Sequence, residues 1–353
     1  MQYGQGAAAP PRIPALDGIR ACAFLTVFAS HAVSERIFPG GLGVTVFFFL
    51  SGYLITTLLR QEAARTGGIS LRNFYIRRAR RILAPMYITV ALGYAALALG
   101  LIATRTTAQA GLATLLYYYN YYALLTGNNL PGGTGVVWSL MIEEHFYFVF
   151  PLLYLGFLRF AWSGRRQAVF LLILCALVLL WRCLLVFGLH TPLDPVHSWT
   201  YRATDARCDA ILWGCVLAVR GNPVFNTAEK FSRALALAGA AVILASLLVR
   251  DPGFRETLRY TLQSAALLPV FQYLVANRAA LLTRWLDGRA LRFIGDHSYA
   301  MYLGHGLALT LVAALPVGKA LVAVAGFGLT LGYAVAMRVL VEAPLRKGKN
   351  VLF

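Results

Sequence analysis

The sequence predicts an all-α protein: a polytopic membrane helix bundle of about ten transmembrane helices plus one interfacial or re-entrant segment, with both termini cytoplasmic. Three observations carry this prediction. Of the 353 residues, 59% are hydrophobic and only 13% are charged, which excludes an ordinary soluble domain. The apolar residues fall into many stretches of about 20 residues, the length that crosses a bilayer as a helix. The basic residues gather on one side of these stretches, as the positive-inside rule requires.

The spans are expected, in chain order, at 13–33, 41–60, 82–102, 136–158, 167–188, 204–219, 233–249, 259–276, 294–314 and 319–341. A further apolar stretch, 111–125, contains the run Tyr117 to Tyr122, in which Asn120 is the one residue that is not a tyrosine. Such side chains suit the membrane interface better than the hydrocarbon centre, so this stretch is not expected to cross. No cleavable signal peptide is evident at the first span.

Charge supports the same topology. With 111–125 outside the membrane core, most of the 32 Lys and Arg residues lie on the side of the N-terminus. If 111–125 crossed, Arg159, Arg165 and Arg166 would face outside and much of the asymmetry would be lost. The net charge of +18 therefore reflects topology, and no nucleic-acid partner is expected. The five cysteines lie in apolar stretches without a Cys-x-x-Cys pair, which indicates buried side chains rather than disulfides or metal ligands.

The first span carries Arg20 and, eleven residues later, His31. Eleven residues make about three turns, so both side chains project from one face, about 16 Å apart along the axis. Ionisable groups at membrane depth are costly and usually mark a functional cavity. The alternative is that Arg20 reaches back to the interface and that His31 is an ordinary helix-end histidine.

The third span begins beside the basic run Arg77, Arg78, Arg80 and Arg81. In one interpretation, such a run has a purely topological role and holds the helix end on the cytoplasmic side. It can also bind phosphate groups, because guanidinium donors match phosphate oxygens and a helix N-terminus adds backbone N–H groups.

The fourth span begins Trp138-Ser-Leu and places Glu143 and Glu144 in an apolar helix. Adjacent residues point about 100° apart, so the two carboxylates are not expected to share a role. Either at least one of them has a direct functional role, or one of them pairs with a buried arginine such as Arg182 or Arg207. The runs 43–53 and 298–305 are typical of close helix packing, and in the second only His305 stands out.

Seven motifs in order resemble one family: Leu16-Asp-Gly-Ile-Arg20 with Arg20-x10-His31, Phe47-Phe-Phe-Leu-Ser-Gly-Tyr, Arg78-x-x-Arg81, Trp138-Ser-Leu-x-x-Glu143, Arg207-x-Asp209-Ala, Ser298-Tyr-x-x-Tyr-Leu-x-His305 and Glu342-Ala-Pro. Together they are similar to the integral-membrane acyltransferase family 3, bacterial O-acetyltransferases that modify exported glycans and related acceptors. The pattern departs from the family at Ala84, which separates Arg81-Ile-Leu from Pro85.

The resemblance implies a single membrane domain over 1–353 in the bacterial inner membrane. Because the chain ends soon after its last span, the extracytoplasmic domain that is fused to some relatives is not expected here. It implies transfer of an acyl group, most simply acetyl, from cytoplasmic acyl-CoA to a hydroxyl of a carbohydrate or glycoside acceptor. Acetyl-CoA would be a co-substrate, with no permanently bound cofactor and no metal. Neither the acceptor, the acyl length nor the oligomeric state is predicted.

The resulting hypothesis gives catalytic roles to His31, Glu143 and Arg20, with Glu143 orienting the imidazole or relaying its proton. The CoA phosphates would bind Arg77, Arg78, Arg80 and Arg81, and acceptor contacts would come from Trp138, Arg207, Asp209 and His305. A proton-coupled secondary transporter or glycan flippase is the alternative from another class, and a non-catalytic scaffold is a third. Inverted repeats would favour a transporter, and the two halves of the sequence show no self-similarity.

Overall fold

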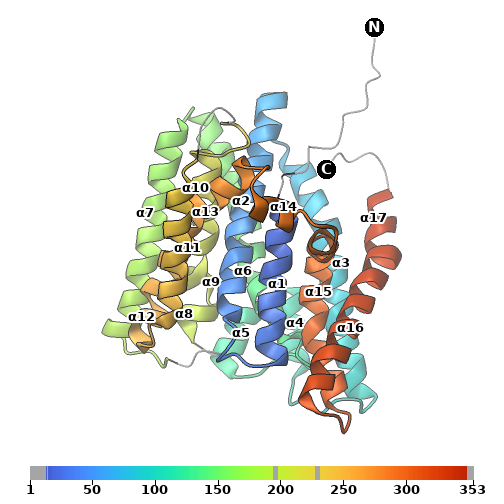
Figure 1. The fold of residues 1–353 in the computed structure, drawn as a ribbon. Helices are drawn as coiled ribbons and strands as arrows, with labels where there is room; N and C mark the ends of the chain where they lie inside the picture. Colours follow the sequence, from blue (N-terminus) through green and yellow to red (C-terminus); the bar gives the residue numbers. More distant parts are fainter. Residues whose placement is uncertain (1–12, 14, 194–197, 227–230, 348–353) are drawn as a thin grey trace.

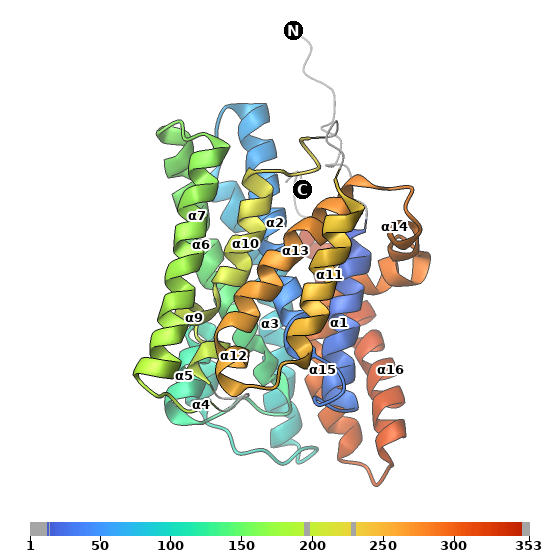
Figure 2. The ribbon, with the colours of Figure 1, turned by 60° about the vertical axis from the view of Figure 1, so that its left-hand side comes forward.

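The computed structural model describes residues 13, 15–193, 198–226 and 231–347, and every regular element in these ranges is a helix. The all-α prediction is therefore confirmed for the described part, while residues 1–12 and 348–353 of the expected single domain lie outside it. Two views show a bundle in which α7, α10, α11 and α13 form one side, α15 and α16 form the other, and α1 and α2 lie between them (Figures 1 and 2).

Each of the ten predicted stretches coincides with helix. The long elements are α1 (Leu16–Ala32), α2 (Gly40–Thr66), α3 (Leu71–Ala98), α6 (Trp138–Arg159) preceded by the 3₁₀ turn η1 (Thr134–Val137), α7 (Gly164–Cys183) continued by the π turn η2 (Leu184–Gly188), α10 (Asp209–Val219), α11 (Arg233–Leu248), α13 (Leu258–Ala276), α15 (Arg289–Ala313) and α16 (Lys319–Met337) continued by the π turn η3 (Arg338–Glu342). The short helices are α4 (Ala108–Leu115), α5 (Tyr119–Thr126), α8 (Trp199–Arg202), α9 (Thr204–Arg207), α12 (Pro252–Glu256), α14 (Leu281–Leu286) and α17 (Ala343–Lys347).

Five continuous helical segments in the described part are long and apolar enough to cross a bilayer: Gly40–Thr66, Leu71–Ala98, Thr134–Arg159, Gly164–Gly188 and Lys319–Leu345. The protein thus has the character of a polytopic helical membrane protein. The count of ten crossings and the side on which the termini lie stay predictions.

The stretch 111–125 forms parts of α4 and α5, which have eight residues each and are too short to cross a bilayer. Tyr117 joins them with φ 61°, a left-handed conformation that ends the first helix and redirects the chain. Both helices lie at the same end of the bundle as α8 and α12 (Figure 1).

Close backbone contacts fix the central helices against one another. A Cβ on Gly52 of α2 would lie 1.9 Å from the carbonyl oxygen of Ile211 in α10, and one on Gly214 would lie 2.0 Å from that of Phe49. A Cβ on Gly295 of α15 would lie 2.0 Å from the carbonyl oxygen of Asp17 in α1. The packing expected for the run 43–53 is confirmed, and α1 is held between α2 and α15.

Candidate active site

A cavity of about 170 Å³ lies among α1, α2, α3, α6 and α15, and we call it the arginine cavity. Its α2 wall extends from Val44 to Leu58, which is about 21 Å along the helix axis. The cavity is therefore long and narrow. Its polar lining comes from Arg20, Ser51, Arg78, Arg81, Ser139, Glu143, Tyr147, Ser298, Tyr299 and Tyr302, and its apolar lining from Val44, Phe47, Phe48, Leu50, Leu54, Leu58, Ile82 and Leu140.

Three guanidinium groups converge on this cavity from two helices, Arg20 from α1 and Arg78 and Arg81 from α3. Arg20 also bonds to Asp17 one turn earlier, with Nη1 3.1 Å from Oδ1. The guanidinium of Arg78 lies 4.5 Å from the centre of the Tyr147 ring, which orients it by a cation–π contact. The cavity wall is strongly cationic, and it suits an anionic ligand with more than one charged group.

The other two arginines of the predicted set lie elsewhere. Arg77 pairs with Glu62 of α2, with Nη2 3.0 Å from Oε2, and Arg80 is not part of the cavity wall. The structure thus brings Arg20 together with Arg78 and Arg81, the two arginines spaced one turn apart on α3.

The expectation that the basic run lies at a helix N-terminus is wrong. Helix α3 begins at Leu71, where the Ser70 side chain accepts a hydrogen bond from the backbone N–H of Asn73. The run begins at the seventh helical residue, where backbone N–H groups are bonded within the helix and cannot bind an anion. Hydropathy indicates where the apolar stretch begins, at residue 82, but the capped helix already begins at Leu71, before the basic run.

Glu143 faces the arginine cavity and is held by two hydroxyl groups. Its Oε2 accepts hydrogen bonds from Ser51 Oγ at 2.8 Å and from Tyr147 OH at 2.7 Å, and the two hydroxyls also contact each other. Sequence reasoning missed Ser51 and Tyr147 as partners of this carboxylate. The spacing of four residues between Glu143 and Tyr147 was the available signal, because such pairs share a helix face.

Glu144 lies on a different face, as the 100° rotation predicts. Its side chain is buried, and Oε1 has no hydrogen-bond partner within the described residues. The two glutamates therefore have separate environments.

His31 is paired with His305, not with Glu143. His31 Nδ1 lies 2.9 Å from His305 Nε2, and His305 Nδ1 lies 2.6 Å from the backbone oxygen of Tyr302. His305 is completely buried, whereas His31 is exposed at the end of α1. Arg20 and His31 thus lie at opposite ends of one helix. Of these two residues, only Arg20 lines the arginine cavity.

Tyr302 connects the cavity to the histidine pair. Its ring lines the cavity and its centre lies 5.5 Å from that of His305. Its hydroxyl is 2.8 Å from Ser139 Oγ, a second lining residue, so a hydrogen bond joins α15 and α6 within the cavity wall. Trp138, next to Ser139, packs against Tyr201 with ring centres 4.8 Å apart and is not part of the lining.

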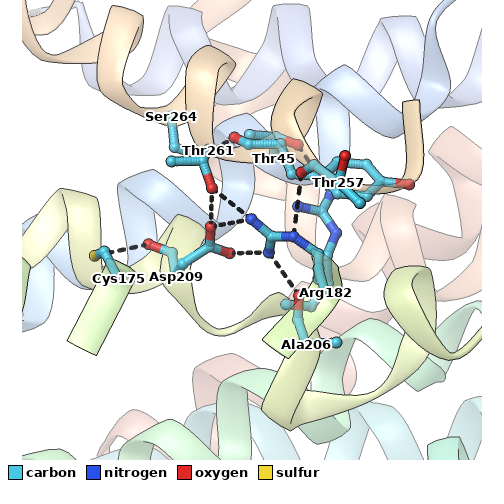
Figure 3. A network of polar contacts seen from close by, with 10 residues as sticks. Thr45, Cys175, Arg182, Ala206, Asp209, Thr257, Thr261 and Ser264 are labelled. Carbon is cyan, nitrogen blue, oxygen red and sulfur yellow. Dashed lines mark hydrogen bonds and ion pairs between the residues drawn. The ribbon is translucent and has the colours of Figure 1, made fainter. Parts of the chain in front are cut away.

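Asp209 belongs to a separate buried network, which Figure 3 shows from close by. Its two carboxylate oxygens accept two hydrogen bonds from Arg182, at 2.8 and 2.7 Å, and Thr261 adds a third at 2.7 Å. Arg182 also donates to the backbone oxygens of Ala206 and Thr257. The alternative in which Arg182 pairs with a glutamate of 136–158 is wrong, because Arg182 forms its ion pair with the carboxylate of Asp209.

Arg207 lies beside this network but is only partly satisfied. Its Nη2 donates to Thr45 at 3.0 Å, and its guanidinium lies 3.9 Å from the centre of the Tyr260 ring. Within the described part of the chain, Nε and Nη1 have no hydrogen-bond partner, although the residue is completely buried. Such a group is costly unless a ligand or water reaches it.

The described residues include no group of three or more His, Cys, Asp or Glu side chains that could hold a metal ion, and the five cysteines are free thiols.

Comparison with known proteins gives one family. A family model described as an acyltransferase domain matches residues 13–339. The peptidoglycan O-acetyltransferase OatA of Listeria monocytogenes is 31% identical over 85% of this chain and 50% of its own length. The O-acetyltransferase OatA of Staphylococcus aureus is 28% identical over 84% of this chain and 50% of its own length. The chain thus spans about half the length of these curated relatives, and no solved structure matches it.

Proposed function

This chain belongs to the acyltransferase family whose model matches residues 13–339, and from that premise we propose that it is a membrane O-acyltransferase. It would move an acyl group, most simply acetyl, from acyl-CoA to a hydroxyl of a glycan or glycoside acceptor. Both relatives are named O-acetyltransferases, which supports acetyl transfer, and the name of the Listeria relative supports peptidoglycan as the kind of acceptor. We place the reaction in the bacterial cytoplasmic membrane, with ten spans and both termini on the donor side.

The arginine cavity is the observation that carries this proposal. Arg20, Arg78 and Arg81 supply the cationic donors that CoA phosphates need. The narrow remainder, along about 21 Å of α2, suits a flexible pantetheine arm better than a bulky ligand. Arg77 and Arg80, which do not line the cavity, are therefore left out of the donor site.

The arm would bring its thioester to the end of the cavity at Tyr302, beside the histidine pair. There His31 takes the proton of the acceptor hydroxyl, and the oxygen attacks the thioester carbonyl carbon. The carbon–sulfur bond breaks, the ester forms, and the CoA thiolate receives the proton. In the covalent variant, the imidazole first attacks the thioester and the acceptor hydroxyl then attacks the acyl-imidazole. For the thioester to meet His31, the Tyr302 ring must move away from Ser139.

The proposed acceptor reaches His31 from the end of α1, where this residue is exposed. We propose that Arg207, with its two unsatisfied donors, stabilises negative charge on the reacting carbonyl or on the acceptor. Trp138 would contact the acceptor, and His305 would act through His31, whereas Asp209 holds Arg182 in place.

The test is turnover of acetyl-CoA by the purified protein in detergent or nanodiscs, followed by release of free CoA thiol. We expect the wild-type protein to hydrolyse or exchange the thioester and His31→Ala to lose at least about 100-fold of this rate. A transporter or a scaffold would release no thiol, and equal rates for wild type and His31→Ala would refute the assigned chemistry. Mass spectrometry of surface glycans from cells with and without the protein then identifies the acceptor.

A further inference from the structure

The contacts of the His31–His305 pair leave only one arrangement of protons when both rings are neutral. His305 Nδ1 faces the Tyr302 backbone oxygen at 2.6 Å. A carbonyl oxygen only accepts, so this nitrogen carries the hydrogen and His305 Nε2 presents a lone pair. His31 Nδ1, 2.9 Å from that lone pair, must then be the donor, and the lone pair of His31 is on Nε2.

We propose that His305 is a positioning residue that holds His31 in the Nδ1–H tautomer and so makes Nε2 the reacting atom. This inference rests on the proposed function, because it assigns the atom of His31 that takes the acceptor proton or attacks the thioester. Both routes through His31 use the same nitrogen.

The surroundings of His305 keep its ring from turning. The Phe24 ring lies edge-on to it, with ring centres 6.0 Å apart and planes 84° apart, and Phe28 lies at 6.4 Å. Tyr302 covers it at 5.5 Å. The side chain is completely buried among these aromatic rings. Rotation would break the bond to the Tyr302 oxygen and would force the ring against the packed aromatic side chains.

The pair is also aligned for a strong hydrogen bond. The ring planes of His31 and His305 are 6° apart, with centres 5.1 Å apart. The 2.9 Å separation of the nitrogens is shorter than a face-to-face stack allows, so the bond joins the two ring edges. When His31 gains a proton on Nε2, Nδ1–H still donates to His305. The ring can therefore accept and release a proton without reorienting.

A triad carboxylate orients its histidine in the same way, and loss of the correct tautomer there costs up to about 10⁴-fold in rate. Here a neutral imidazole would do this work, because the carboxylate of Glu143 is engaged by Ser51 and Tyr147.

The test combines nitrogen chemical shifts with rates, using the full chain labelled with ¹⁵N-histidine in nanodiscs. His31→Ala identifies the His31 signals among those of the six histidines. We expect a protonated Nδ1 and an unprotonated Nε2 in the wild type. His305→Met removes the acceptor, so His31 should lose this preference and kcat should fall about 100-fold at unchanged KM for acetyl-CoA. His305→Gln restores an acceptor oxygen and should keep both the tautomer and, within about fivefold, the rate.

The matched control is His297→Gln on the same helix, whose native Nδ1 also lies near a backbone oxygen of α15, that of Phe293 at 2.7 Å. It should change neither readout. A protonated Nε2 on wild-type His31, or an unchanged tautomer in His305→Met, overturns the proposal. If the expected tautomer is found but His31→Ala stays fully active, the proposed function fails and with it the catalytic meaning of the pair, while the proton arrangement stands.

Discussion

Arg81 offers a direct test of the donor site, because its substitution should weaken binding only of donors that carry phosphate. Arg81 is an exposed residue of α3 that lines the arginine cavity. A charge-assisted hydrogen bond contributes about 1.5–3 kcal/mol, and an exposed partner belongs at the lower end. The substitution Arg81→Gln should therefore cost about 1.5 kcal/mol, which is about a tenfold rise in the Kd of CoA.

The assay is titration calorimetry of CoA and of pantetheine against the purified protein at two salt concentrations. We expect the tenfold loss for CoA, less of it at high salt because exposed charges are screened, and no loss for pantetheine. Arg72→Gln is the matched control, since Arg72 is exposed on the same helix but is not part of the cavity lining. An equal loss for both ligands, or a loss of CoA affinity in Arg72→Gln, would refute the phosphate assignment.

Three further predictions concern the other parts of the site and fold. Glu143→Gln keeps an acceptor for its two hydroxyl partners but removes a negative charge from the cationic cavity wall, so calorimetry should find CoA binding at least as tight as in the wild type. Weaker CoA binding in this variant would contradict the assignment of the phosphates to the arginines. Asp209→Asn breaks the buried ion pair with Arg182 and should lower the free energy of unfolding by about 3–5 kcal/mol, measured as a lower melting temperature in detergent. An unchanged melting temperature together with poorer use of the acceptor would instead assign Asp209 to substrate binding. Gly52→Ala places a methyl group 1.9 Å from the backbone oxygen of Ile211 and should lower the melting temperature. Gly156→Ala is the control, because a Cβ there has no atom within 4 Å and should leave the melting temperature unchanged. Equal effects of the two substitutions would contradict the packing argument.

The positions of the helices could be predicted from the sequence because hydropathy and helix length are properties of single segments. The same holds for the pairing of Arg78 with Arg81, which follows from helical periodicity. The start of α3 could not be found this way. Its first three turns carry Arg72, Asn73 and the basic run, and hydropathy does not distinguish a helix that extends into water from a loop.

The partners of the ionisable groups needed the tertiary structure. Arg182 and Asp209 are 27 residues apart, and His31 and His305 are 274 apart. A membrane helix that is apolar on most faces carries little information about its rotation, so the sequence indicates which polar groups lie on apolar helices but not which of them meet. The motif ending in His305 resembled helix packing for this reason, although its last residue contacts the side chain of His31.

The contact between Tyr302 and Ser139 also bears on the membrane as an insulator. Three guanidinium groups in a water-filled passage from one face to the other would form a selective path for small anions, driven by the membrane potential. Under the proposed function, the bond between Tyr302 and Ser139 would interrupt such a path before the histidine pair. The arginine cavity would then open to the donor side without discharging the ion gradients that the membrane maintains.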